Sequence, residues 1–371
     1  MGILYDGREI GLMPILFKNF TAAQLHASLA PAGVTPRLAR RLQSAVFRHG
    51  VLPADLPETS GKVLAEIRRL TQIPDLELLA KVVSPQDAFA KYLFRGAGPE
   101  PFEAVRIPLL HRPGAPKYVV CVSSQVGCAL GCVFCATGRL GFHRNLAAWE
   151  IVDQVVKIQA DSPHPVRGVV FMGMGEPLLN FEPVIHAAQI LSESCAMAIA
   201  GKAITISTVG IVPGIRRYTA ERHPYRLVVS LTSADSARRR ELMPVESRYP
   251  VAEVIQALRE YHAATGIRVT LAWTLISGVN TREQDAEQLA DLTRGLPITL
   301  DLIDVNDPSG RFQPPSAAER NAFRDALTAK LGMPVARRYS GGQDIHAACG
   351  MLAGQTASTR AGYKASHDWS D

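Results

Sequence analysis

The sequence predicts an α/β protein in which a partial parallel β/α barrel follows a small helical domain. Short runs rich in Val, Ile and Leu alternate with amphipathic helical segments from about residue 100 onward, a pattern typical of parallel β/α units. About six such units follow one another, which favours a barrel over a doubly wound sheet. Residues 1–90 show apolar residues at helical spacing between turn residues, which indicates helices.

The helical domain, residues 1–90, is expected to contain three helices. Thr21 and Ser60 each precede a segment of helical period and are suited to cap it, because a hydroxyl oxygen can accept a hydrogen bond from a free backbone N–H in the first turn. The segments that show this period are 21–30, 36–47 and 60–70.

The barrel domain is expected over residues 91–352, with a loop carrying four cysteines at 121–138 and a C-terminal cysteine loop at 341–352. Its strands are predicted at 103–110, 117–124, 167–172, 202–208, 225–232, 268–276, 298–305 and 334–339. Its helices are predicted at 147–160, 181–194, 211–221, 235–243, 251–265, 281–295 and 316–332. Reactive groups should follow the carboxyl ends of the strands. The polar tail, 353–371, is expected to be disordered.

Composition and charge narrow the class of protein. The chain has 371 residues, 47% of them hydrophobic and 20% charged, and no run approaches the roughly 18 apolar residues of a membrane helix. The start lacks a secretory pattern, so we expect a cytoplasmic protein without membrane association. The oligomeric state stays open, with a monomer as the default expectation. Six cysteines, mostly clustered, indicate metal ligation or catalysis rather than a disulfide framework.

Basic residues are concentrated in the helical domain. Residues 1–70 contain nine Lys or Arg against five Asp or Glu, within a formal charge of +6 for the whole chain. Such an excess suits a polyanion such as nucleic acid, although a solvated helix surface would carry the same charges. The arginines concerned are Arg37, Arg40, Arg41, Arg48, Arg68 and Arg69.

Three cysteines, Cys128, Cys132 and Cys135, form a C-x3-C-x2-C motif directly after a predicted strand. Three thiolates on one loop can hold three irons of a cubane cluster and leave the fourth iron open. A structural zinc site or a buried cysteine cluster are the alternatives, but zinc favours paired ligand elements. With Phe134 before the third cysteine, the spacing resembles the signature of the radical S-adenosylmethionine (SAM) superfamily, whose open iron is chelated by SAM.

Residues after the following strands suit a SAM site. FMGMGEP, 171–177, offers glycines for a close backbone approach and Glu176 for an ammonium group. Small polar residues, Ser207, Ser230 and Asn306, follow later strands and can hydrogen-bond ribose or carboxylate. Each of them alone is equally consistent with turn chemistry.

Two further cysteines lie far apart in the sequence of the barrel domain. Cys121 precedes the cluster loop and Cys349 lies after the last strand between glycines, so a barrel would bring their loops together, where two thiols can cycle through a disulfide. A Cys–His hydrolase that uses Cys349 and His346 is conceivable, but it leaves the cluster motif unexplained. Cys195 is interpreted as a small buried residue.

The motifs CVSSQVGCALGCVFCATG, GFHRNL, VVFMGMGEPLLN, ITISTVGIVPGI, RRRELMP and DIHAACG occur in this order. Together they resemble the RlmN/Cfr family of radical SAM RNA methyltransferases over about residues 90–353. The resemblance implies a radical SAM fold, one 4Fe–4S cluster, SAM, an electron donor such as flavodoxin or ferredoxin, and methylation of an adenine carbon, C2 rather than C8, in rRNA and/or tRNA.

The resemblance also implies roles for individual residues. One SAM methylates Cys349, and a second is cleaved at the cluster to a radical that takes a hydrogen from this methyl group. The carbon radical then adds to adenine, Glu103 removes a proton, and Cys121 forms a transient disulfide with Cys349 that releases the product. Residues that match the family's SAM contacts are Gly175, Glu176, Ser207, Ser230, Leu231, Thr232 and Asn306. The helical domain would clamp folded RNA through phosphate contacts.

The chain departs from the common pattern of the family in its second half. The departures are Thr232, Ala272 with Trp273, Asp301 with Asp304, and Met351. All cysteines that the reaction needs are present, so we expect the reaction type to be intact and the substrate or the methylated position to differ. Two alternatives stay open: a radical SAM methyltransferase of a non-RNA substrate, and a non-catalytic iron–sulfur or zinc protein that binds nucleic acid.

Overall fold

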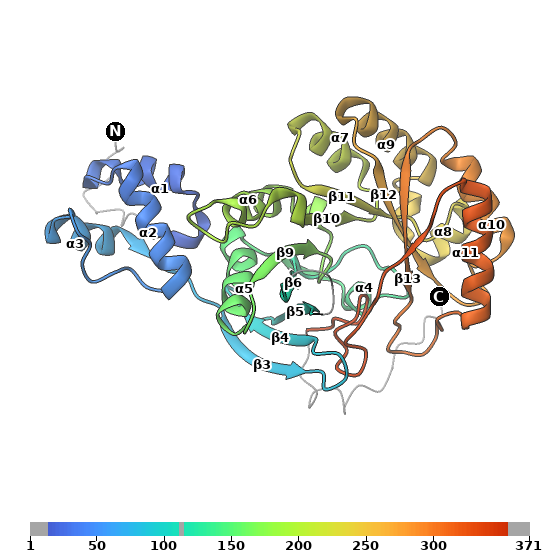
Figure 1. The fold of residues 1–371 in the computed structure, drawn as a ribbon, viewed down its shortest axis with the longest axis horizontal. Helices are drawn as coiled ribbons and strands as arrows, with labels where there is room; N and C mark the ends of the chain where they lie inside the picture. The colour runs from blue at the N-terminus through green and yellow to red at the C-terminus, as the bar shows by residue number, and fades with distance from the viewer. Residues whose placement is uncertain (1–13, 111–114, 355–371) are drawn as a thin grey trace, which may run out of the picture.

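The structure is a computed structural model that describes residues 14–110 and 115–354. A helical domain lies to one side of a larger α/β domain (Figure 1). Most of the segment expected to be a disordered tail, from residue 355 onward, lies outside the described residues. No helix in the described part is long and apolar enough to cross a membrane.

Between residues 14 and 70 the structure contains helices at the three segments where the sequence indicates them. Thr21 accepts a hydrogen bond from the backbone N–H of Gln24, and Ser60 accepts one from Val63, so both expected N-caps are confirmed. The elements are β1 (Ile15–Leu16), η1 (Phe17–Asn19), α1 (Ala22–Leu29), η2 (Ala30–Ala32), α2 (Pro36–His49), α3 (Gly61–Leu70) and β2 (Thr71–Gln72). Their apolar side chains form a core of their own, separate from that of the barrel.

One ten-stranded sheet forms the centre of the described α/β domain. Its order is β14-β13-β12-β11-β10-β9-β6-β5-β4-β3. Neighbours from β6 to β14 are parallel, and β3 to β6 pair antiparallel. The strands are β3 (Glu77–Val83), β4 (Ala90–Arg95), β5 (Phe102–Leu109), β6 (Lys117–Cys121), β9 (Val166–Phe171), β10 (Ile204–Thr208), β11 (Arg226–Ser230), β12 (Val269–Leu275), β13 (Ile298–Asp304) and β14 (Ala336–Arg337).

The segment after residue 70 differs from the prediction. Residues 77–83 form β3, an edge strand of the large sheet, and not part of a helical domain that extends to residue 90. Leu78, Val82 and Val83 of this strand are exposed, so it lacks the alternation that marks a half-buried strand. The change from helices to sheet therefore occurs near residue 71.

Helices cover the outer face of the sheet (Figure 1). The helices of this domain are α5 (Ala148–Ala160), α6 (Phe181–Ser192), α7 (Val212–Glu221), α8 (Ser236–Leu242), α9 (Val251–Thr265), α10 (Glu283–Leu292) and α11 (Ala317–Leu331), with η3 (Pro177–Leu179), η4 (Gly201–Ala203) and η5 (Pro244–Ser247). The short helix α4 (Ala136–Leu140) follows the cysteine loop and is not part of this outer layer. A short hairpin of β7 (Gln125–Gly127) and β8 (Phe142–Asn145) brackets the cysteine loop.

The sheet curves into a partial barrel. Residues of β5 and β6 on one side and of β13 and the segment 336–341 on the other line the same cavity, of about 1250 Å³. The outermost described strands, β3 and β14, do not pair with each other, so the barrel stays open along one seam. Side chains alternate along a strand, and the inward-facing set of β6 therefore includes Val119 and Cys121.

Candidate active site

The three clustered cysteines lie on the loop between β7 and α4. Gly127 opens this loop with φ of +73°, and a Cβ there would lie 1.9 Å from the carbonyl oxygen of Gly141. Cys128 donates its backbone N–H to the same carbonyl at 2.8 Å, and Cys135 donates to Cys132 at 3.1 Å. A glycine is thus required at position 127 for the chain to turn back tightly and present its thiols.

The thiols of this loop influence one another. Burial raises the pKa of Cys128 to about 12, and the charges of Glu176 and Cys135 add to the increase. Burial also raises the pKa of Cys132, followed by the charges of Cys135 and Cys128. Without cationic compensation the three thiolates would therefore repel one another.

The donor set fits an iron–sulfur cluster better than a single ion. No group of three His, Cys, Asp or Glu side chains in the described part of the chain is arranged to hold one metal ion. A cubane takes one thiolate at each iron, so its ligands do not converge on a common centre. Its irons would supply the positive charge that the buried thiolates of Cys128, Cys132 and Cys135 need.

The glycine-rich turn after β9 packs tightly against the segment that leads into the cluster loop. A Cβ on Gly173 would lie 2.6 Å from the carbonyl oxygen of Val122. Gly175 has φ of +98°, and a Cβ there would lie 2.5 Å from the Cβ of Gln125. Both glycines are therefore required by the close approach of the protein's own segments, and their contact with a ligand stays a prediction.

Glu176 is buried directly after this turn. Its carboxylate oxygens accept hydrogen bonds from the backbone N–H groups of Leu178 and Val209, each at 3.0 Å. Burial raises the pKa of Glu176 to about 7, although these hydrogen bonds lower it. A bound ammonium group would offset the cost of burying this charge, so the position suits the amino group of SAM.

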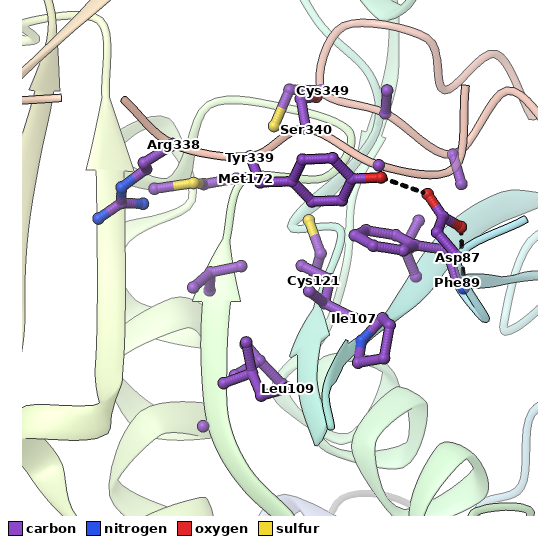
Figure 2. Close-up of a pocket in the computed structure, with 18 of the residues that line it drawn as sticks. Asp87, Phe89, Ile107, Leu109, Cys121, Met172, Arg338, Tyr339, Ser340 and Cys349 are labelled. Atoms are coloured by element: carbon purple, nitrogen blue, oxygen red, sulfur yellow. Dashed lines mark hydrogen bonds between the residues drawn. The ribbon is translucent and has the colours of Figure 1, made fainter. Parts of the chain in front are cut away.

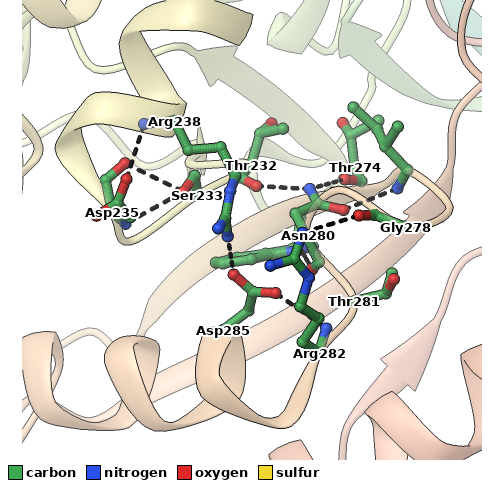
Figure 3. A network of polar contacts seen from close by, with 12 residues as sticks. Thr232, Ser233, Asp235, Arg238, Thr274, Gly278, Asn280, Thr281, Arg282 and Asp285 are labelled. Atoms are coloured by element: carbon green, nitrogen blue, oxygen red, sulfur yellow. Dashed lines mark hydrogen bonds and ion pairs between the residues drawn. The ribbon is translucent and has the colours of Figure 1, made fainter.

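The other residues expected to contact SAM follow their strands on the same side of the sheet. Ser207 lies in β10 and Ser230 ends β11, both half-buried. Leu231 and Thr232 are buried, and Thr232 has φ of +62°. Figure 3 shows the carbonyl of Thr232 accepting a hydrogen bond from the side chain of Asn280, at 2.7 Å. This network fixes the strained turn after β11.

Asn306 contacts the C-terminal cysteine loop. Its amide nitrogen donates to the carbonyl of Asp304 and the hydroxyl of Ser340, each at 3.0 Å, and to the carbonyl of Cys349 at 3.4 Å. Its amide oxygen accepts from Gln343 at 2.7 Å. Asn306 therefore positions the Cys349 loop. It is also one of the residues that the sequence predicts to contact SAM.

The C-terminal cysteine loop lies directly on the cluster loop. The backbone N–H of Ala136 donates to the carbonyl of Gly350 at 2.7 Å. The hydroxyl of Thr137 donates to the carbonyl of Leu352 at 2.6 Å, and both partners are buried. Segments more than two hundred residues apart are thus joined by hydrogen bonds beside Cys135.

Cys121 and Cys349 line one cavity (Figure 2). Both are free thiols; Cys121 is buried at the end of β6 and Cys349 is exposed. Burial raises the pKa of Cys121, and the charge of Cys349 raises it further. The two thiols are therefore close enough to interact.

Glu103 is fully buried on β5. Its carboxylate forms an ion pair with Lys91 at 3.0 Å. It also accepts hydrogen bonds from the backbone N–H groups of Ala353 and Gly354 at 2.7 and 3.0 Å. Residues 353–354, which follow the cysteine loop, therefore cover the carboxylate, and Glu103 is not among the residues that line the cavity.

Comparisons with known proteins identify the family. The Radical SAM superfamily model matches residues 122–292. A Thermus thermophilus protein named "Probable dual-specificity RNA methyltransferase RlmN" is 43% identical over 81% of this chain and 82% of its own length. The chain belongs to the RlmN family of radical SAM methyltransferases. Membership implies a 4Fe–4S cluster and SAM, which the cysteine loop fits.

Two further relatives of the RlmN-type chain cover most of it. A Myxococcus xanthus protein named "Probable RNA methyltransferase" is 47% identical over 91% of this chain and 93% of its own length. The crystal structure of a radical SAM methyltransferase from Sphaerobacter thermophilus superposes with a TM-score of 0.83, at 37% identity, over 92% of this chain and all of that one. The predicted fold class and reaction class are therefore confirmed.

The structure of this RlmN-type chain adds residues that the sequence did not indicate. One of these residues is Lys91, which pairs with Glu103. Its position, a lysine among the apolar residues of the stretch AKYLFR, was the signal in the sequence that could have indicated it. Tyr339 lines the cavity, and its hydroxyl donates to Asp87 at 3.1 Å (Figure 2). Asp87 also accepts the backbone N–H of Gly342, so it holds the start of the cysteine loop.

The departures of this chain from its family have structural partners here. Asp301 forms an ion pair with Arg338 at 2.7 Å on the cavity wall. Trp273 is buried and donates its indole N–H to the carbonyl of Asn280. Met351 is buried beside the cysteine loop. Cys195 is half-buried and donates to Gln43 of α2 at 2.8 Å, so it joins the turn after α6 to the helical domain.

Proposed function

We propose that this RlmN-type methyltransferase transfers a methyl group through Cys349 to an adenine carbon, C2 rather than C8, of rRNA and/or tRNA. One observation carries the proposal: the Cys349 loop is hydrogen-bonded to the cluster loop and opens on the cavity that also holds Cys121. This arrangement brings a methyl carrier, a release thiol and the expected cluster to one place.

The residues divide the work of cofactor binding. Cys128, Cys132 and Cys135 would ligate three irons and leave the fourth for SAM. When bound, the cluster supplies the electron that cleaves SAM reductively, received from a donor such as flavodoxin or ferredoxin. Glu176 would accept the amino group of SAM, and the turn at Gly175 allows the backbone to approach it. Ser207, the turn 230–232 and Asn306 would hydrogen-bond the rest.

The two cavity thiols act in sequence. Cys349 would carry the methyl group as a thioether. Loss of a hydrogen atom from this methyl group would leave a carbon radical that bonds to the adenine carbon, and the adduct would then lose the ring hydrogen as a proton and return one electron to the electron-transfer cofactor. The Cys121 thiolate then attacks the Cys349 sulfur: an S–S bond forms, the C–S bond to the product breaks, and its electron pair stays with the product carbon, which takes a proton. An external dithiol reduces the disulfide before the next turnover.

Glu103 would remove the proton from the substituted adenine carbon. Lys91 and the two backbone N–H groups of residues 353 and 354 stabilise its carboxylate in the structure. These two N–H groups bind the carboxylate oxygen of Glu103 that would face the adenine ring. Segment 353–354 therefore has to move before the adenine can reach Glu103.

The cavity wall also offers a surface for the base. Tyr339 is 74% exposed, yet its hydroxyl is held by Asp87 and its ring contacts Phe89 edge-on. A fixed, exposed aromatic ring beside a reactive thiol suits stacking of an adenine turned out of its helix. We therefore assign Tyr339 as the platform for the target base.

Part of the charge of the helical domain is paired within the protein: Arg69 and Arg37 pair with Glu66 and Glu58. Arg41 and Arg68 donate to backbone carbonyls and keep their charge. Arg40 interacts with Cys195, and Arg48 is exposed and would be available for RNA phosphates. We still expect this protein to be a cytoplasmic monomer.

Replacement of the methyl carrier tests the proposal. Cys349→Ala should abolish methylation of ribosomal and transfer RNA, because no thioether can form, while reductive SAM cleavage persists. Cys195→Ala is the matched control, since this cysteine lies at the domain interface. Mass spectrometry of nucleosides from treated RNA reads the product and separates 2-methyladenosine from 8-methyladenosine. Retained methylation by the Cys349 variant would refute the carrier role.

Replacement of the release thiol gives a second test. Cys121→Ala should trap a covalent protein–RNA adduct at Cys349, because no thiol remains to break the C–S bond. Denaturing gel electrophoresis with labelled RNA detects the adduct, and ribonuclease digestion followed by peptide mass analysis locates it. Normal turnover without adduct would remove Cys121 from the mechanism.

A further inference from the structure

The cavity that holds the two thiols extends to the opposite end of the barrel strands. There it is lined by four basic residues: Lys117, Arg167, Lys202 and Arg226. Lys117 and Arg226 are the first residues of β6 and β11. Arg167 is the second residue of β9, and Lys202 lies in η4 directly before β10. We call these four residues the basic rim; they belong to four neighbouring strands of the sheet.

An irregularity of the sheet brings Arg167 into the rim. Tyr118 pairs with Val166, and Val119 pairs with Gly168, so Arg167 is an extra residue on β9. Such a bulge turns a side chain away from the face that strict alternation would give it. Arg167 therefore lines the cavity together with Gly168, its neighbour in sequence.

The rim charges are not neutralised within the protein. No ion pair or hydrogen bond joins the four side chains to any other residue in the described ranges 14–110 and 115–354. Lys117 is half-buried, and the other three are exposed. The cavity as a whole is lined by six Lys or Arg and two Asp. Both Asp are already engaged, Asp301 by Arg338 and Asp87 by the N–H of Gly342.

We infer that the basic rim binds consecutive phosphates of the RNA strand whose target adenine reaches Cys349. Lys117 and Cys121 are the two ends of β6, four residues or about 13 Å apart, which is about four nucleotide steps of a stacked strand. The inference rests on the proposed function and adds a phosphate subsite to it. Continuity of the cavity from the rim to the thiols favours a threaded polyanion over a small free anion.

Another use of the same charges is local. Strands of a β/α unit begin close to where the preceding helices end, and a cation there stabilises the helix dipole. Arg268 provides the comparison: it also directly precedes a strand, β12, and is exposed. It is not part of the cavity and donates to the carbonyl of Ile298. Arg226 and Arg268 thus carry the same charge at the starts of neighbouring strands, one inside the cavity and one outside.

The test compares Arg226→Gln with Arg268→Gln in the full-length, cluster-loaded protein. The probe is a fluorescently labelled oligoadenylate RNA, and its dissociation constant is measured at several salt concentrations. Arg226→Gln should weaken binding several-fold and reduce the slope of log K against log[salt] by about 0.7, the value for one phosphate contact on a single strand. Lys117→Gln with Arg226→Gln should reduce it by about 1.4. Arg268→Gln should change neither.

The outcomes separate the subsite from the proposed function. Equal effects of Arg226→Gln and Arg268→Gln, or unchanged slopes, would overturn the rim as a phosphate site, while wild-type methylation of RNA would leave the proposed function standing. Competition by millimolar inorganic phosphate that displaces the oligonucleotide fully would indicate a small-anion site and overturn it as well. Slower reduction by flavodoxin with unchanged RNA binding would show that the rim docks the electron donor instead.

Discussion

Glu103 shows how strongly one residue depends on its surroundings. In the sequence it looks like an ordinary carboxylate on a surface strand. In the structure it is buried on β5, and its partners are Lys91 and two backbone N–H groups. A buried carboxylate without such partners would be unstable. The neighbours of Glu103 come from β4 and from residues 353–354, and together they make a charge at this place tolerable.

Glu176 leads to a prediction about pH. Its carboxyl is buried and its pKa is raised to about 7 from 4.5, so between these pH values the folded protein binds more protons than the unfolded chain. The free energy of unfolding should therefore fall as pH rises from about 4.5 to 7, by roughly 3 kcal/mol. Urea unfolding of the cluster-free protein at pH 5 and pH 7.5 measures this loss.

Glu176→Gln is the control for this pH dependence. The amide cannot ionise, so the variant should lose less free energy of unfolding over the same pH interval than the wild type. It gives up one backbone acceptor and should be less stable at pH 5 by about 1 kcal/mol. Identical pH dependence in both proteins would show that another group titrates there.

Tyr339 leads to a second prediction at the residue scale. Tyr339→Ala should lower kcat/KM for RNA by roughly 5- to 150-fold, because it removes about 1–3 kcal/mol of stacking with one base. Tyr339→Phe keeps the ring and loses only the hydrogen bond to Asp87, so its effect should be much smaller. Steady-state methylation kinetics compare the two variants. Equal losses would place the role in the hydroxyl and not in the ring.

Among the elements, the C-terminal cysteine loop has no regular structure and is held by contacts with other segments. Asp87 accepts the N–H of Gly342, Asn306 reaches the carbonyl of Cys349, and Thr137 donates to Leu352. These partners come from three separate parts of the chain. The loop is therefore positioned by a few hydrogen bonds, which allows segment 353–354 to open above Glu103.

Thr137 gives the prediction at this scale. Thr137→Val should leave the buried carbonyl of Leu352 without its partner and cost about 1–3 kcal/mol locally, so amides of residues 347–354 should exchange hydrogen faster. Hydrogen–deuterium exchange followed by mass spectrometry reads this segment. Thr328→Val is the control, since its hydroxyl bonds only within exposed α11. Unchanged exchange at 347–354 would show that other contacts hold the loop.

The described residues form two hydrophobic cores that are joined by apolar and polar contacts, and Phe47 of α2 packs into the core of the barrel. Lys18 of the helical domain and Asp153 of α5 form a buried ion pair at 2.6 Å, and Asp153 also accepts the N–H of Leu76. Asn19 accepts the N–H of Trp149, at the start of α5. The helical domain is thus fixed on the barrel by specific partners, in the orientation that RNA would meet.

A variant of the buried pair tests this docking. Lys18→Met should destabilise the protein by about 3–5 kcal/mol, because it leaves the charge of Asp153 buried and unpaired. Combining it with Asp153→Asn removes that charge and keeps an acceptor for Leu76, so the double variant should recover much of the loss. Urea unfolding of the single and double variants gives both values. Additive losses would contradict a coupled pair.

Local patterns predicted most elements, but not the whole sheet, and the roles of the three clustered cysteines as ligands stay a prediction. The helices that begin at Thr21 and Ser60 followed from capping and period, and the parallel strands followed from their apolar runs. Strand β3 escaped prediction because its Leu and Val side chains are exposed on an edge. The role of Lys91 was missed because it depends on an ion pair with Glu103, which lies on the neighbouring strand β5.

The sequence by itself determined the order of the β/α units, the three-cysteine loop and the membership of a methyltransferase family, because each of these rests on short-range spacing. The sequence also predicted that the Cys349 loop returns beside Cys121. Only the tertiary structure decided that this loop is hydrogen-bonded to the start of α4, that Glu103 is covered, and that the basic rim lines one end of the cavity. These features are contacts between residues that lie far apart along the chain. The curvature of the sheet brings these residues together around one cavity, and no local spacing in the sequence encodes that curvature.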